Sequence, residues 1–267
     1  MTTRRDFLST ASLAATGLAL APLAACSQAS PPAAPTASAS ASTETPFAGP
    51  LLKRFVDAGA SVIDTAPTYS SAEDALGDLV AQAGLRDRLF LATKLSGVSG
   101  IEQGLMQFGE SLRRLRTDRI DLLQVHNLRD TRIQFALARE LKQQGKVRLI
   151  GLTHYRDEAH TELADEMRAL KPDFVQINYS VVSRGAERTI FPLARELGIA
   201  VMVNRAFEDG RLFAQVKGKP LPAWASEVGA DSWAQLFLKF VLGEAAVTVV
   251  IPATSKPRNQ TDNLKAG

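Results

Sequence analysis

Residues 89–126 read LFLATKLSGVSGIEQGLMQFGESLRRLRTDRIDLLQVH, and this stretch is the most informative about the fold. Aliphatic runs at 89–93 and 122–125 flank an amphipathic segment at 101–115. A short apolar run bounded by loops is typical of a buried strand, and the longer segment has the apolar spacing of a helix. The stretch therefore predicts a strand, a crossover helix and a second strand parallel to the first.

The same alternation extends over most of the chain. Further apolar runs lie at 61–64, 149–152, 174–177, 200–203 and 247–251, separated by amphipathic segments at 71–82, 132–144, 160–170, 189–197 and 232–242. Repeated strand and helix units in 267 residues favour an α/β fold, the (β/α)8 TIM barrel. Only these seven strands are visible, and a helix at 51–58 precedes them. We therefore expect an incomplete barrel whose first strand is absent.

The composition argues against several classes of function. The net charge is +3, and Lys and Arg are scattered among Asp and Glu, so we expect no nucleic-acid partner. Cys26 is the only cysteine, which excludes an internal disulfide and a cysteine-based metal site. The three histidines form no His-x-x-x-His pair. We expect no catalytic metal.

The first 26 residues have the layout of an export signal. Arg4 and Arg5 precede an uncharged apolar run at 11–25, which is shorter than the roughly 20 residues of a membrane-spanning helix. The arginine pair resembles a signal for the twin-arginine translocase, and LAAC at 23–26 resembles a bacterial lipobox. We expect export to the periplasm or cell surface, with the protein anchored to a membrane through lipidated Cys26.

Residues 27–46 are almost entirely Ser, Ala, Pro and Thr. Such a composition buries too little apolar surface to offset the entropy cost of ordering the chain. We expect a disordered tether here, and a barrel domain at 47–267.

Four polar residues lie at or just beyond the ends of three consecutive expected strands: Asp64, Tyr69, Lys94 and His126. The carboxyl ends of parallel strands emerge on one rim of a barrel, so these side chains should converge. Each residue alone is more often structural than catalytic. Their joint occurrence on one rim favours a site.

This set suits the reduction of a carbonyl group. A hydride that arrives at the carbonyl carbon leaves an alkoxide that needs a proton, and an unperturbed phenol donates poorly at neutral pH. The ammonium of Lys94 would favour the phenolate form of Tyr69, and Asp64 would keep Lys94 charged and oriented. His126 would orient the carbonyl oxygen by a hydrogen bond.

The motif around Tyr69 resembles a known family. DTAPTY at 64–69, ATK at 92–94, LQVH at 123–126 and GKVRLIG at 145–151 are similar, in order and spacing, to the aldo/keto reductases, and the likeness covers 51–267. The resemblance implies NAD(P)H-dependent reduction of an aldehyde or ketone. It gives Tyr69 the role of general acid, with Asp64, Lys94 and His126 completing the catalytic tetrad.

The resemblance also implies positions for the cofactor. Thr153, His154 and Gln176 would hold the nicotinamide carboxamide, and Asn204-Arg205 stands where many members place an aromatic ring, so an Arg face would stack instead. The tail resembles the adenosine-phosphate segment through Thr254, Ser255, Lys256, Arg258 and Asn263. Lys256 and Arg258 would meet a 2′-phosphate, which favours NADP(H) over NAD(H).

Two other interpretations of the sequence remain open. The absent first strand is compatible with a non-catalytic relative that binds a nicotinamide nucleotide, or with a truncated inactive product. An extracytoplasmic binding protein would explain the lipid anchor but not the Lys and Tyr pattern. The sequence does not specify the substrate, which depends on the loops after the strands.

Overall fold

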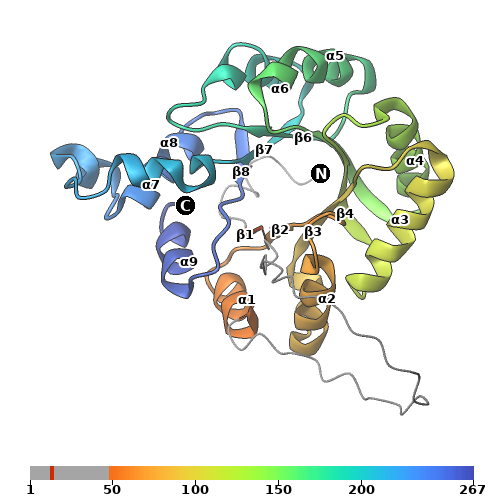
Figure 1. Cartoon of the computed structure of the whole chain (residues 1–267), viewed down its shortest axis with the longest axis horizontal. Coiled ribbons are helices and arrows are strands. Elements are labelled where there is room, and N and C mark those ends of the chain that lie inside the picture. The colour runs from red at the N-terminus through yellow and green to blue at the C-terminus, as the bar shows by residue number, and fades with distance from the viewer. Residues whose placement is uncertain (1–12, 15–47) are drawn as a thin grey trace, which may run out of the picture.

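The computed structural model describes residues 13–14 and 48–267. All seven expected strands are present, and each pairs in parallel with its neighbour in the sequence. They are β2 (Val62–Asp64), β3 (Phe90–Leu95), β4 (Ile120–His126), β5 (Val147–Thr153), β6 (Phe174–Asn178), β7 (Ala200–Asn204) and β8 (Val247–Val250). The strands curl around a central axis with the helices outside them, as in a TIM barrel (Figure 1).

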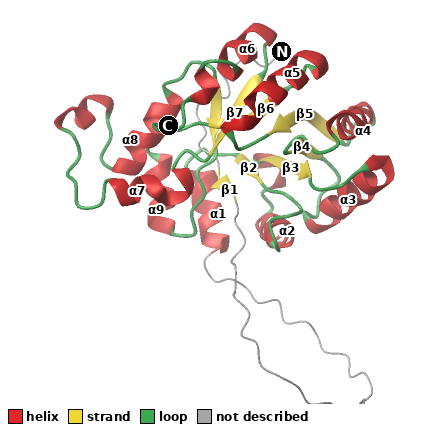
Figure 2. Cartoon of the chain, turned by 45° about the horizontal axis from the view of Figure 1, so that its top comes forward, coloured by secondary structure: helices red, strands yellow, loops and turns green. Residues whose placement is uncertain are grey.

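The helices form the outer layer (Figure 2). They are α1 (Ala48–Asp57), α2 (Ala72–Ala83), α3 (Gly100–Arg114), α4 (Thr131–Gln143), α5 (His160–Leu170), α6 (Ile190–Leu197), the short α7 (Arg211–Gln215), α8 (Trp233–Leu242) and α9 (Pro257–Leu264). The last helix, α9, packs beside α8 and also beside α1. The two ends of the helical layer therefore meet next to β8.

The edge of β2 differs from the sequence-based expectation. A two-residue strand, β1 (Leu13–Ala14), pairs in parallel with β2, with Leu13 opposite Ile63 and Ala14 opposite Asp64. These two residues belong to the apolar run at 11–25, for which only a role in export was expected, and they lie where no first strand was expected. A buried parallel strand requires the same apolar composition as a signal segment, so composition does not separate the two uses.

The strand order runs from β1 to β8, and within the described residues no β8–β1 pairing joins the two ends. Arg4, Arg5, Cys26 and the expected tether at 27–46 lie outside the described residues. No helix in the described part of the chain is long and apolar enough to cross a membrane.

The period of two along each strand separates an inner core from an outer one. Val62, Phe90, Leu122, Phe174 and Met202 pack together inside the barrel, whereas their strand neighbours, such as Ile63 and Leu91, pack against the helices. Inward positions recur at every second residue. Two residues above the inner core, the same faces therefore carry Asp64, Gln124, Gln176 and Asn204. These polar side chains therefore lie directly above the apolar inner core of the barrel.

Candidate active site

The centre of the site is a buried ion pair between neighbouring strands. Lys94 Nζ, at the end of β3, lies 2.6 Å from Asp64 Oδ2, at the end of β2, and both side chains are almost fully buried. The ammonium also donates to the main-chain oxygen of Thr65 at 2.9 Å. Burial by itself lowers the pKa of Lys94, but the Asp64 carboxylate and the Tyr69 phenol outweigh burial and raise that pKa above its usual value. Lys94 is therefore a cation at neutral pH.

Tyr69 and His126 complete the cluster expected from the sequence. Lys94 Nζ lies 4.8 Å from the centroid of the Tyr69 ring. The Tyr69 and His126 rings meet edge to face, with centroids 6.2 Å apart and planes at 84°. The structure thus brings a carboxylate, an ammonium, a phenol and an imidazole together on one rim, in an order that allows the phenol to contact both the ammonium and the imidazole.

His126 is a neutral group in this environment. Burial, the charge of Lys94 and the neighbouring His154 together lower the pKa of His126 to about 4. Ser96 Oγ lies 2.7 Å from His126 Nδ1. At neutral pH, His126 can therefore act as a hydrogen-bond donor without adding a second positive charge beside Lys94.

Comparison with known proteins shows the family. A model of the aldo/keto reductase family matches residues 36–267. The chain belongs to the aldo/keto reductase family. Aldo-keto reductase YhdN of Bacillus subtilis (strain 168) is 30% identical over 167 residues, which are 57% of this chain and 49% of that protein. This family member thus matches about half the length of that curated relative.

Solved structures of aldo/keto reductases share the fold. The enzyme from Klebsiella pneumoniae, solved with NADP and acetate, has a TM-score of 0.70 and 26% identity, covering 82% of this chain and 78% of its own. An aldo-keto reductase from Bacillus halodurans, in its holo form, has a TM-score of 0.67 and 24% identity, covering 82% and 80%. The second likeness supports the fold alone.

The residues expected around the nicotinamide carboxamide form one hydrogen-bonded set. Gln176 Oε1 accepts hydrogen bonds from Thr153 Oγ1 at 3.0 Å and from Asn204 Nδ2 at 3.3 Å. Asn204 Nδ2 also donates to the main-chain oxygen of His154 at 3.2 Å. Thr153 and Asn204 end β5 and β7, His154 directly follows β5, and Gln176 lies in the middle of β6 between them. The structure therefore brings together the four residues that were expected near the nicotinamide.

Two groups of this set are suited to form hydrogen bonds with a carboxamide. Asn204 Oδ1 is buried without a hydrogen-bond partner among the described residues, so it can accept from an amide NH2 group. His154 Nδ1 accepts from the main-chain N–H of Arg156, and burial lowers the pKa of His154, so its ring hydrogen is on Nε2. A donor and an acceptor thus remain for the carbonyl oxygen and the NH2 group of a carboxamide.

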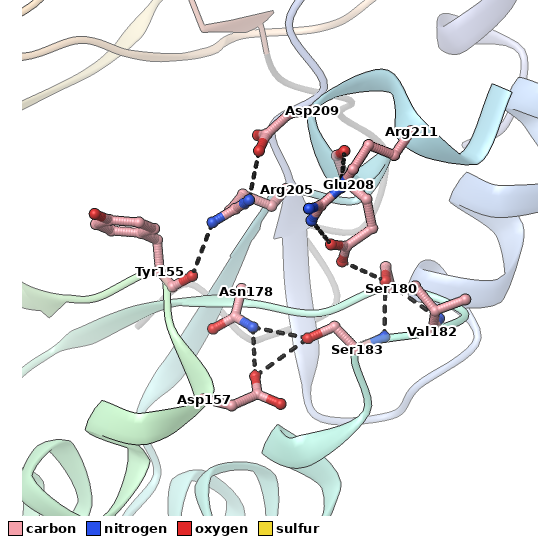
Figure 3. Close-up of polar contacts among 10 residues, drawn as sticks. All are labelled: Tyr155, Asp157, Asn178, Ser180, Val182, Ser183, Arg205, Glu208, Asp209 and Arg211. Carbon is pink, nitrogen blue, oxygen red and sulfur yellow. Dashed lines mark hydrogen bonds and ion pairs between the residues drawn. The ribbon is translucent and has the colours of Figure 1, made fainter. Parts of the chain in front are cut away.

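Arg205, which directly follows Asn204, contacts two residues of neighbouring loops. Its guanidinium contacts Asp209, donates to the main-chain oxygen of Tyr155 at 3.5 Å and lies 5.5 Å from the Tyr155 ring centroid (Figure 3). Its Nε atom is buried and has no hydrogen-bond partner within residues 13–14 and 48–267. Glu208 and Arg211 pair beside it, and Glu208 also accepts from Ser180 (Figure 3).

The tail residues form a separate group. Thr254 and Ser255 lie between β8 and α9. Lys256 occupies the N-cap position of α9, and Arg258 lies in the first turn of that helix. Lys256 and Arg258 are exposed, and within the described residues their side chains have no ion-pair partner. Asn263 is buried in the last turn of α9. No hydrogen bond within the described part of the chain joins this group to the carboxamide set.

The structure adds Gln124, which was not among the site residues expected from the sequence, to the surroundings of Asp64. Gln124 Nε2 donates to Asp64 Oδ1 at 2.9 Å, and Gln176 Nε2 donates to the same oxygen at 3.1 Å. Oδ1 is thereby held by two amides, which leaves Oδ2 for Lys94. The signal for Gln124 was present, because it is a polar residue inside the apolar strand β4, two positions before His126.

Gly151 explains how Gln124 fits inside the barrel. A Cβ atom at Gly151 would lie 3.0 Å from the main-chain oxygen of Phe174 and 3.1 Å from Gln124 Cγ. Such contacts are tighter than most Cβ contacts in proteins, so a side chain here would have to displace its neighbours, and glycine at this position makes room for the Gln124 side chain. No group of three or more His, Cys, Asp or Glu side chains within residues 13–14 and 48–267 could hold a metal ion.

Proposed function

We propose that this chain reduces an aldehyde or ketone to an alcohol with a nicotinamide cofactor, preferably NADP(H). The observation that carries the proposal is the buried Lys94 ammonium, held between Asp64 at 2.6 Å and the Tyr69 ring at 4.8 Å. The NADP complex of the Klebsiella pneumoniae relative supports the choice of cofactor.

In this mechanism the bound cofactor supplies a hydride to the carbonyl carbon. Tyr69 donates its phenolic proton to the carbonyl oxygen, and Lys94 stabilises the phenolate that remains. Asp64 keeps Lys94 charged and fixed, and His126 orients the carbonyl oxygen by donating a hydrogen bond. Thr153, His154, Gln176 and Asn204 would hold the carboxamide, and Arg205 lies beside them.

The direct test is reduction of an aromatic aldehyde by the purified chain, followed as the loss of reduced-nicotinamide absorbance. We expect turnover with NADPH and quenching of intrinsic fluorescence when NADPH binds. Binding without turnover would favour a non-catalytic nucleotide-binding relative. Absence of both would contradict the proposal.

Lys256 and Arg258 are proposed to bind the 2′-phosphate, because both are exposed cations without an ion-pair partner in the described structure. Replacing either by Met should weaken NADPH binding roughly tenfold, the usual worth of one charge-assisted hydrogen bond, and leave NADH binding unchanged. Fluorescence titration with both cofactors measures this. Lys265→Met, which removes another exposed cation from the tail, is the matched control. Equal weakening of NADH and NADPH binding would remove the phosphate role.

We also propose that the protein is exported by the twin-arginine translocase and anchored through lipidated Cys26. The support is the order of Arg4-Arg5, the apolar run and Cys26 in one segment. Replacing both arginines by Lys should retain the protein in the cytoplasmic fraction, and Cys26→Ala should separate it from the membrane. Unchanged membrane delivery of the Lys variant would defeat the assignment.

A further inference from the structure

We propose that Ser96 is a positioning residue that sets the tautomer of His126. Its hydroxyl donates to Nδ1, which leaves the ring hydrogen on Nε2, the nitrogen that is free to bind a carbonyl oxygen. The inference deepens the proposed function and rests on it for the role of His126. Ser96 directly follows β3, two residues after Lys94, so it lies on the same rim as the tetrad.

The main chain of Ser96 is fixed by a side chain of α3. Gln107 Oε1 accepts from the Ser96 N–H at 2.7 Å, and Gln107 Nε2 donates to the Ser96 carbonyl at 2.9 Å. This reciprocal pair holds both main-chain groups of Ser96. Ser96 is also buried, so its hydroxyl has a defined position 2.7 Å from His126 Nδ1.

The burial of Ser96 decides which atom donates. His126 is the single hydrogen-bond partner of the Ser96 hydroxyl in the described structure. If Nδ1 carried the hydrogen and donated to Oγ, the hydroxyl hydrogen would be buried without an acceptor, which is unfavourable. If the hydroxyl donates to Nδ1, both groups are satisfied. The second arrangement is therefore the more stable one.

Because His126 is neutral, its tautomer decides whether Nε2 donates or accepts a hydrogen bond. Burial, Lys94 and His154 lower the pKa of His126 to about 4, so at neutral pH the ring carries one N–H. A carbonyl oxygen accepts hydrogen bonds and does not donate them. An imidazole with its hydrogen on Nδ1 would present a lone pair to that oxygen. The hydrogen bond from Ser96 thus selects the form of His126 that can orient the substrate.

The test combines NMR with kinetics. The chain has only three histidines, so a 15N-histidine-labelled sample of the full chain gives a tractable long-range 1H–15N spectrum, and His126→Asn assigns the signal. At pH 7, without cofactor or substrate, we expect His126 to carry its hydrogen on Nε2. In Ser96→Ala we expect a mixture of tautomers, and a kcat for aldehyde reduction lowered by roughly tenfold with little change in NADPH affinity.

Two further variants separate positioning from packing. Ser96→Thr keeps the hydroxyl and should restore both the Nε2–H tautomer and kcat. Ser111→Ala removes another buried serine hydroxyl, which has no hydrogen-bond partner in the part of the chain that the structure describes, and should change neither. A wild-type His126 with its hydrogen on Nδ1, or a Ser96→Ala variant with unchanged tautomer or unchanged kcat, would overturn the inference. A chain without reductase activity would overturn the proposed function instead, while the spectrum would still decide the tautomer.

Discussion

Tyr69→Phe should lower the turnover of aldehyde reduction by a factor on the order of 10² to 10⁴, the usual worth of a positioned general acid. The substitution removes the phenolic proton but keeps the ring that lies 4.8 Å from Lys94 Nζ and packs edge-on against His126. The shape of the site is therefore preserved. Steady-state kinetics with NADPH in excess measure the loss, and fluorescence titration should show an almost unchanged NADPH affinity.

Tyr155→Phe provides the matched control, because it makes the same change in another tyrosine near the rim. No hydrogen bond of the Tyr155 hydroxyl is present in the described structure, so its removal should leave turnover within about a factor of two, as is usual for such surface changes. Wild-type turnover in Tyr69→Phe would refute the assignment of the general acid. Equal losses in both variants would point to a general effect of the substitution on folding.

Lys94→Met should lower the free energy of unfolding by about 3–5 kcal/mol, because it leaves the Asp64 carboxylate buried without its counter-ion. The pair is 2.6 Å long and almost fully buried. Gln124 and Gln176 would still donate to Asp64 Oδ1, but two neutral donors do not replace an ammonium. Urea unfolding followed by circular dichroism measures the change, and reductase activity should be lost in the same variant.

A double-mutant cycle isolates the charge pair from the loss of packing. Asp64→Asn combined with Lys94→Met removes both charges and keeps a carbonyl oxygen for the two glutamine donors, so the double variant should be less destabilised than the sum of the single ones. Lys142→Met is the surface control. Lys142 Nζ lies 2.5 Å from Asp173 Oδ2, but both side chains are about one-third exposed, so we expect a loss of at most about 1 kcal/mol. Additive losses around the cycle would contradict a coupled pair.

Most of the candidate site could be predicted from the sequence, for an identifiable reason. Asp64 and His126 each end a strand, Lys94 is the last residue but one of β3, and the carboxyl ends of parallel strands share one rim. Their convergence thus follows from three local patterns and one topological rule. Gln124 and Ser96 were not predicted as site residues. Each belongs to the site only through a hydrogen-bond partner on another strand, 60 and 30 residues away in the sequence.

The apolar run beside β2 shows that composition alone does not distinguish a strand from an export signal. The apolar run at 11–25 suits an export signal and a buried strand equally well, since both need uncharged aliphatic residues. Only the pairing of Leu13 with Ile63 and of Ala14 with Asp64 places part of that run in the sheet.

The amino-acid sequence is sufficient to predict the type and order of the elements from β2 to β8, apart from the short α7, because the apolar period changes between two and 3.6 residues along the chain. It also predicts which strands carry an ionisable side chain at or near their carboxyl end. The register between strands follows only from the folded structure, and so do the hydrogen bond from Gln176 to Asp64 across 112 residues and the contact of Ser96 with His126. Register depends on how the inner side chains pack around a glycine such as Gly151, and packing between distant segments leaves no local pattern in the sequence.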